Sequence, residues 1–234
     1  DDQILSSIVK SAFALLQRGK AHETRITALI EGALTNGGEY TIYAASEIFG
    51  FHTAQLPTSL LEVLIVHLRR VNPSHKGTLD NIDFGISHLL KSGDPEKAIQ
   101  FLEDALLAHP KELTMNAFDD AAREILSNMA LISKVLTRWF LRGDRVLCDG
   151  VHTIVGTGYR DDLPLEIDPT ELKLADHVHV LFIARKAIGY LFMRPISAAA
   201  VLISLMRYAT DSEVLVRLGV LLFDPILLNF TGKG

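Results

Sequence analysis

Four basic residues are the most distinctive group of potentially functional side chains in this sequence. Lys134, Arg138 and Arg142 recur every four residues within an apolar helical pattern, and Arg145 follows three residues later. Residues four apart lie on one face of an α-helix, so the first three are expected to form one stripe. Cationic groups in such a stripe bind phosphates or an acidic protein surface. These four residues are therefore the candidate binding site, with an ordinary solvated helix face as the alternative.

A thiol and an imidazole lie one helical turn apart further along the chain. Cys148 is the single cysteine of the sequence, and His152 follows four residues later. A neighbouring imidazole can lower the pKa of a thiol and make it a nucleophile. The residues around Cys148 are mostly apolar, which favours a small buried core side chain instead. We therefore assign no catalytic residue here.

The other motifs that could bind a metal or a cofactor are incomplete. His177 and His179 would point about 200° apart on a helix, so they cannot hold one ion. Gly156-Thr157-Gly158 lacks the third glycine of a dinucleotide-binding loop. The acidic pairs Asp119-Asp120 and Asp161-Asp162 are expected to be solvated. The sequence therefore predicts no metal, no cofactor and no enzymatic activity.

Helices must position all of these side chains, because apolar residues recur at three- and four-residue steps along nearly the whole chain. The first predicted helix ends near residue 19. Eight further helices are predicted over about 26–36, 40–51, 60–71, 79–90, 95–109, 117–126, 130–141 and 145–155. After a loop at 156–169, helices are expected from about 170 to 193, over 197–208 and over 212–223.

Several helix ends have clear signals in the sequence. Asp94 followed by Pro95 is a good N-cap with proline at the first helical position. Asp168 with Glu171 three residues later predicts a capping box at the start of the helix after the loop. Pro225 is expected to end the last helix.

The spacing of the predicted helices indicates a repeat architecture. Helix pairs that start near residues 3, 39, 78 and 116 are about 36 to 39 residues apart, within the range of helical repeats. We therefore predict an all-α fold, a right-handed α-solenoid of antiparallel helix pairs, with an irregular helical bundle as the alternative. Repeats over 1–155 and 170–234 are expected to be continuous with each other.

Two segments resemble known helical repeats. Residues 92–98, Ser-Gly-Asp-Pro-Glu-Lys-Ala, with Leu102, Ala105 and Pro110, resemble the second half of a tetratricopeptide repeat. Residues 210–217, Thr-Asp-Ser-Glu-Val-Leu-Val-Arg, resemble the start of a helix in HEAT repeats. These resemblances imply a helical-repeat fold and no particular activity.

Composition excludes several classes of protein. The chain has 234 residues, with 48% hydrophobic and 22% charged residues, so it is neither disordered nor of low complexity. The net charge of −5 disfavours nucleic-acid binding over the whole surface. Charged residues interrupt every apolar run before about 20 residues, so no membrane span is expected. We expect an intracellular, cytoplasmic location and a chain that is part of a larger multidomain protein.

These observations favour a protein-interaction or scaffold module whose partner is another protein or another domain of the same chain. The alternative is a nucleic-acid- or phosphate-binding effector domain that uses Lys134, Arg138 and Arg142. The apolar helices between 215 and 230 show no polar capping repeat of the kind that solenoid ends need. Self-association through these C-terminal helices is therefore a further expectation.

Overall fold

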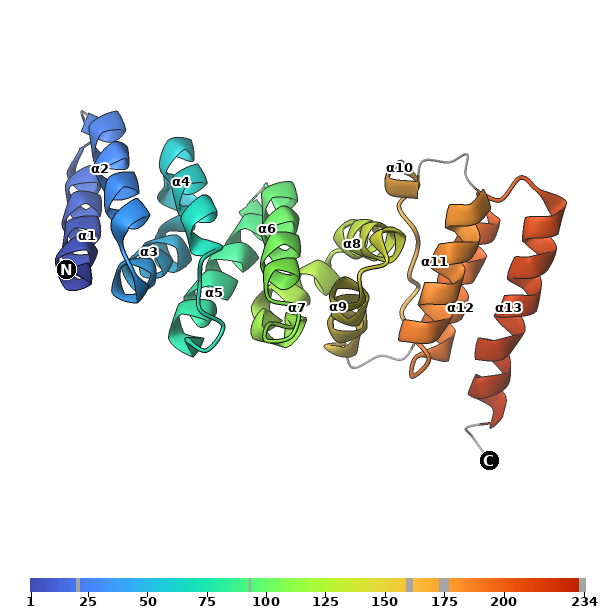
Figure 1. Ribbon diagram of the computed structural model, residues 1–234. Coiled ribbons are helices and arrows are strands. Elements are labelled where there is room, and N and C mark those ends of the chain that lie inside the picture. Colours follow the sequence, from blue (N-terminus) through green and yellow to red (C-terminus); the bar gives the residue numbers. More distant parts are fainter. Residues whose placement is uncertain (20–21, 93, 159–161, 173–176, 232–234) are drawn as a thin grey trace. The chain divides into compact units, whose positions relative to one another are not determined.

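The computed structural model is built from helices (Figure 1). It describes residues 1–19, 22–92, 94–158, 162–172 and 177–231, and these ranges contain thirteen α-helices and no β-strand. The first seven helices are α1 (Asp2–Arg18), α2 (Glu23–Asn36), α3 (Glu39–His52), α4 (Thr58–Leu68), α5 (Lys76–Ser92), α6 (Pro95–Ala108) and α7 (Asp119–Ser127). The others are α8 (Met129–Arg142), α9 (Arg145–Gly156), α10 (Pro169–Leu172), α11 (His177–Tyr190), α12 (Pro195–Met206) and α13 (Ser212–Thr231). The prediction of an all-α fold is confirmed.

The chain divides into two compact units, Asp1–Ala121 and Ala122–Gly234. The division lies within α7, and the predicted loop at 156–169 belongs to the second unit. Residues 162–168 of that loop are irregular, as expected. Throughout the described ranges, no helix has both the length and the apolar character that a membrane crossing requires.

In the first unit, α3 packs between α1 and α5, and α2 and α4 contact each other (Figure 1). Many side-chain hydrogen bonds between its helices join residues 33 to 39 positions apart. Asn81 of α5 donates to Ser46 of α3, and Phe84 contacts Phe51, one turn further along both helices. Because this offset stays nearly constant along the two helices, α3 and α5 run parallel to each other.

Two glycines allow α3 and α5 to approach closely. A Cβ on Gly50 would lie 2.7 Å from the carbonyl oxygen of Asn81, and one on Gly85 would lie 2.4 Å from the ring of Phe49. Any side chain at these positions would force the helices apart. Eight of the fourteen residues of α3 are buried, including Phe49, and the exposed ones lie along one side of the helix.

In the second unit, α11, α12 and α13 pack on one another, and α8 contacts α9, α10 and α11. The side chain of Asn128 caps the start of α8 by accepting the N–H groups of Ala130 and Leu131 at 3.0 and 3.4 Å. Gly143 ends this helix in the left-handed conformation, with φ of 74°. The ring of Phe182 lies within 2.8 Å of where a Cβ of Gly143 would stand, so both conformation and space require glycine here.

The predicted helix ends were partly right. Asp94 caps α6 as predicted, with its carboxylate accepting the N–H of Lys97 at 3.3 Å. The prediction that Pro225 ends the last helix is wrong, because α13 continues to Thr231. Pro225 is buried inside this helix, where it cannot donate an N–H to the carbonyl four residues earlier.

The predicted capping box forms in half. Asp168 caps α10 by accepting the N–H of Thr170 at 2.8 Å, and Pro169 is the first residue of this helix. The carboxylate of Glu171 binds Arg138 instead of turning back to Asp168, whose N–H donates to Thr137 at 2.8 Å. The helix that begins at Pro169 ends at Leu172, and α11 begins at His177; residues 173–176 of the predicted long helix lie outside the described residues.

Candidate functional site

The predicted basic stripe of Lys134, Arg138 and Arg142 lies on α8, and Glu171 of α10 packs against two of its residues. Arg138 binds Glu171 with two hydrogen bonds, from Nη2 at 2.6 Å and from Nε at 3.2 Å. Lys134 Nζ lies 3.8 Å from the same carboxylate. This bidentate geometry is the strongest form of an arginine–carboxylate pair. Two of the four predicted cations are therefore brought together, but around a carboxylate of the protein itself.

The other two cations also lie beside carboxylates. Arg142 Nε is 3.3 Å from Asp144, and Arg145 Nε is 3.6 Å from Asp149. Arg145 is highly exposed on α9 and does not join the group around Glu171. Nearby carboxylates cancel most of the positive potential that a phosphate would need. The pairing of Arg138 with Glu171 could not be seen in the sequence because the two are 33 residues apart, whereas Asp144 and Asp149 lie two and four residues from Arg142 and Arg145 and could have been weighed there.

The thiol and the imidazole that the sequence places one turn apart have different surroundings. Cys148 is fully buried, with its Sγ 3.7 Å from the carbonyl oxygen of Trp139. Burial raises the pKa of this thiol to about 11, so it stays protonated at neutral pH. His152 lies with its Nδ1 2.8 Å from the carbonyl oxygen of Tyr190. Cys148 is therefore a core residue, as its apolar neighbours in the sequence indicate.

The most prominent surface feature of the first unit is a group of exposed aromatic side chains on α3 and α5. We call it the aromatic face: Tyr40, Tyr43 and Phe51 on α3 with Phe84 on α5, which are 61%, 41%, 64% and 40% exposed. The residues on α3 follow steps of three and eight, so they share one side of the helix. That side is the one left in solvent by the packing of α3 between α1 and α5.

Contacts within the aromatic face hold its rings in place. The rings of Phe51 and Phe84 are 5.9 Å apart, and Phe84 meets His88 edge-on at 4.7 Å. The Nζ of Lys10 lies 5.9 Å from the centre of the Tyr43 ring and 2.7 Å from Glu47. The rings of Phe51, Phe84 and Tyr43 are therefore in contact with side chains of neighbouring helices.

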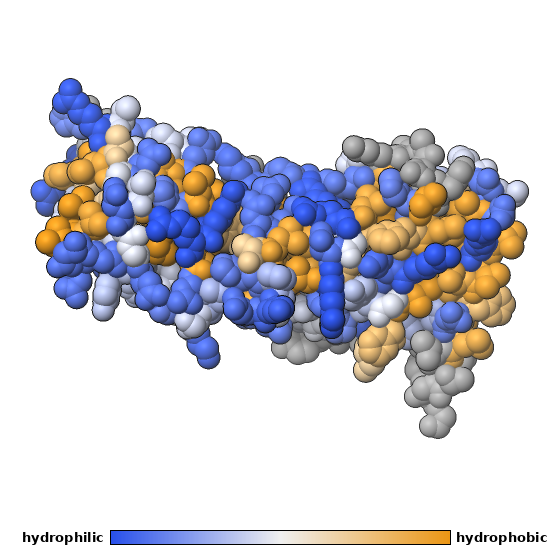
Figure 2. Space-filling model, viewed as in Figure 1, coloured by the Kyte–Doolittle hydropathy of each residue, from blue (hydrophilic) through white to orange (hydrophobic). Residues whose placement is uncertain are grey.

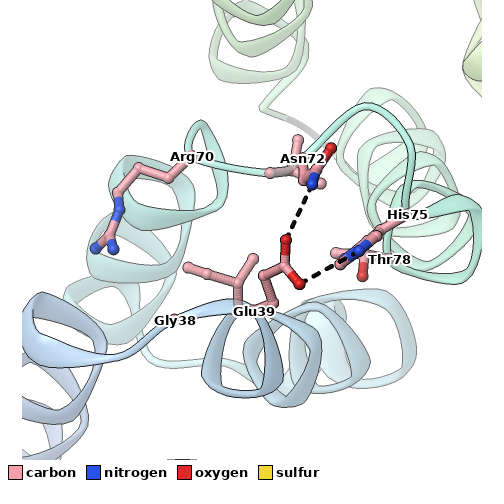
Figure 3. Close-up of a pocket in the computed structure, with 8 residues that line it drawn as sticks. Gly38, Glu39, Arg70, Asn72, His75 and Thr78 are labelled. Carbon is pink, nitrogen blue, oxygen red and sulfur yellow. Dashed lines mark hydrogen bonds and ion pairs between the residues drawn. The ribbon is translucent and has the colours of Figure 1, made fainter. Parts of the chain in front are cut away.

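A small pocket adjoins this face at the beginning of α3 (Figure 3). Asn72 donates to Glu39 at 2.9 Å, and Nε2 of His75 lies 3.4 Å from the other carboxylate oxygen. The guanidinium group of Arg70 points away from Glu39. It donates to the backbone carbonyls of Leu34 and Gly37 at the C-terminal end of α2. The pocket has a volume of about 200 Å³.

A shallower hollow of about 560 Å³ continues from the pocket toward the aromatic face. Its lining includes Tyr40 and Tyr43 from α3 and Gly77 from α5, together with Glu39 and His75. Gly77 carries no side chain, so the edge of the Tyr43 ring stays accessible there. The hollow therefore offers aromatic surface bordered by one carboxylate and one imidazole.

A buried carboxyl group joins α5 to α7. Asp83 is 3% exposed and accepts the N–H groups of Asp120 and Ala121, both at 2.9 Å. Burial raises the pKa of Asp83 to about 7; the nearby charges of Asp120 and Asp119 act in the same direction, against the lowering effect of the two backbone hydrogen bonds. The side chain therefore caps the start of α7 and titrates near neutral pH.

The carboxylate oxygens of Asp83, Asp119 and Asp120 lie within 4.8 Å of one another. Such oxygens suit hard cations, but both oxygens of Asp83 already accept backbone N–H groups, which points to a structural role. Our sequence analysis missed Asp83, although the sequence indicates that it is buried. Leu79, Ile82 and Ile86 recur at helical spacing, and Asp83 falls on the apolar face that they form.

The comparisons with known proteins assign no family to this chain. No protein-family model matches it, and neither the curated proteins nor the solved structures contain a significant match.

Proposed function

We propose that this chain is a non-enzymatic helical-repeat module that binds another protein through the aromatic face of its first unit. A right-handed α-solenoid of antiparallel helix pairs, similar to HEAT or tetratricopeptide repeats, is the proposed architecture. The offset of 33 to 39 residues between hydrogen-bonded helices of the first unit supports it. In the second unit, hydrogen bonds that join helices to loop or helix-end residues span 31 to 43 residues. Repeats of this size stack so that each contacts its neighbours and leaves an extended surface for a partner.

The observation that carries the proposal is the composition of the exposed line on α3. Four residues of this helix are exposed, and three of them are Tyr40, Tyr43 and Phe51. Aromatic side chains are enriched in the centres of protein interfaces, where each can bury a large area at a low cost in rotamer entropy. A partner segment that places apolar side chains among these rings fits the surface best.

The basic stripe supports the alternative function less well. Phosphate binding needs cations whose charge is available, whereas Lys134 and Arg138 face Glu171 and Arg142 faces Asp144. We therefore place the partner site on the aromatic face and not on α8.

The proposal is tested by affinity co-purification of the whole chain and two variants from a lysate of its native cell. The double variant Tyr40→Ala/Phe51→Ala removes the two most exposed rings of the aromatic face. The matched control is Val66→Ala, which shortens an exposed apolar side chain on α4. Circular dichroism confirms that all three proteins have the same helix content.

We expect one protein to be retained by the wild type and by the control, and to be lost from the double variant. Retention of the same protein by the double variant would contradict the proposal. Recovery of nucleic acid that is lost at high salt, and that depends on Lys134, Arg138 and Arg142, would support the alternative function instead.

A further inference from the structure

The last helix of the second unit exposes a continuous apolar line. Val216, Val220, Phe223 and Leu227 of α13 are 66%, 65%, 65% and 54% exposed. Their steps of four, three and four keep them on one side of the helix over about 17 Å. The opposite side, with Val214 and Leu218, is buried in the packing with α11 and α12. Figure 2 shows hydrophobic side chains gathering over α11–α13.

We propose that this line pairs with the same line of a second copy of the chain, with the two α13 helices antiparallel about a two-fold axis. The steps of four, three and four residues are the same in both directions along the helix. A two-fold contact requires this symmetry, because every contact between a residue of one copy and a residue of the other occurs a second time with the copies exchanged. Val216 then lies opposite Leu227 of the second copy, and Val220 lies opposite Phe223 of the second copy. Both pairs share one midpoint, between positions 221 and 222.

Charges beside the apolar line favour a second copy over other apolar partners. Glu213, Arg217 and Asp224 all lie along the same edge of the line, while the other edge carries Gly219 and Ile226. In an antiparallel pair of helices, equivalent edges meet. A parallel pair would instead set these charges against the uncharged edge of the second copy, with Gly219 and Ile226, and would leave them without partners there.

The antiparallel arrangement brings opposite charges together twice. Arg217 is displaced by two residues, about 3 Å along the axis, from Asp224 of the second copy, which is within reach of its side chain. Arg217 is paired with Glu213 on its own helix. Among the residues that the structure describes, Asp224 has no ion-pair partner, so the second copy would supply one.

Sedimentation velocity of the whole chain, from about 1 to about 200 μM, tests whether the pair forms. We expect a reversible monomer–dimer equilibrium. Val220→Glu places a carboxylate near the two-fold axis in both copies, and should raise the dissociation constant at least tenfold. Val66→Glu, the same change at a similarly exposed valine on α4, should leave it unchanged. A wild type that stays monomeric throughout this range would overturn the proposal.

Charge exchange tests the orientation of the pair. Arg217→Asp and Asp224→Arg should each weaken the dimer several-fold, because each places like charges together at both contacts. The double exchange should restore dimerisation to within about twofold of the wild type. A dimer that responds to neither single exchange, or is not restored by the double exchange, would rule out the antiparallel arrangement. The Tyr40→Ala/Phe51→Ala variant should dimerise normally, which separates this proposal from the proposed function.

Discussion

The buried carboxyl group of Asp83 should make the stability of the first unit fall as the pH rises. A folded-state pKa of about 7, against the ordinary value of 3.8, means that the folded chain keeps a proton that the unfolded chain releases. Between these two pH values the folded state binds more protons, so the free energy of unfolding decreases with pH. The slope approaches about 1.4 kcal/mol per pH unit midway and is smaller near each pKa, so the loss between pH 4 and pH 7 is about 3 kcal/mol.

The Asp83→Asn variant isolates this contribution. An asparagine amide would place a donor against one of the two N–H groups at the start of α7, which costs stability equally at every pH. The difference in unfolding free energy between wild type and variant therefore cancels the titration of groups that do not interact with Asp83. We expect the stability of the wild type relative to the variant to fall by about 3 kcal/mol from pH 4 to pH 7.

Urea denaturation followed by circular dichroism, repeated from about pH 4 to about pH 8, measures this difference. Fluorescence of Trp139 reports on the second unit and identifies its transition separately. Asp80→Asn, at an exposed carboxylate one turn earlier on α5, is the matched control and should show no such dependence. A difference that is flat or rises with pH would refute the reasoning, because the hydrogen bonds from α7 would then outweigh burial.

Three further predictions follow from individual contacts. Gly85→Ala should destabilise the first unit by about 1–3 kcal/mol in urea denaturation, because its Cβ would lie 2.4 Å from the ring of Phe49. Gly32→Ala is the control, because its Cβ would meet no atom within 4 Å, and it should stabilise α2 by up to about 1 kcal/mol. Equal effects of the two changes would contradict the close packing of α3 and α5. Glu171→Ala should release the cations of α8 and raise the salt concentration needed for elution from heparin, and Glu166→Ala should not. Cys148 should react with iodoacetamide orders of magnitude more slowly in the folded chain than in urea, and fast labelling of the folded chain would show that its thiol is accessible.

Local patterns in the sequence predicted most of the helices and some of their ends. Asp94 and Pro95 begin α6 as predicted, because capping and the proline preference depend on neighbouring residues. The same local reasoning predicted that Pro225 ends the last helix, and this prediction was wrong. A proline removes one N–H, but α13 continues past Pro225, which is buried in it.

The candidate sites depended on residues that are distant in the sequence. Spacing alone placed Lys134 and Arg138 on one face of a helix, but only the folded chain brings Glu171 against them. Periodicity alone placed Tyr40, Tyr43 and Phe51 on one side of a helix, yet it could not show that this side is the exposed one.

Periodicity, caps and glycines act over one or two turns, so the helical fold and the positions of most helices can be predicted from the sequence alone. Packing between helices determines which face of each helix meets water, which distant charges pair and which groups a buried carboxyl such as Asp83 contacts. These properties arise from contacts between residues about 35 positions apart, such as Asn81 with Ser46 and Asp83 with the start of α7. A single sequence contains no local signal for such contacts, because they depend on how whole helices pack.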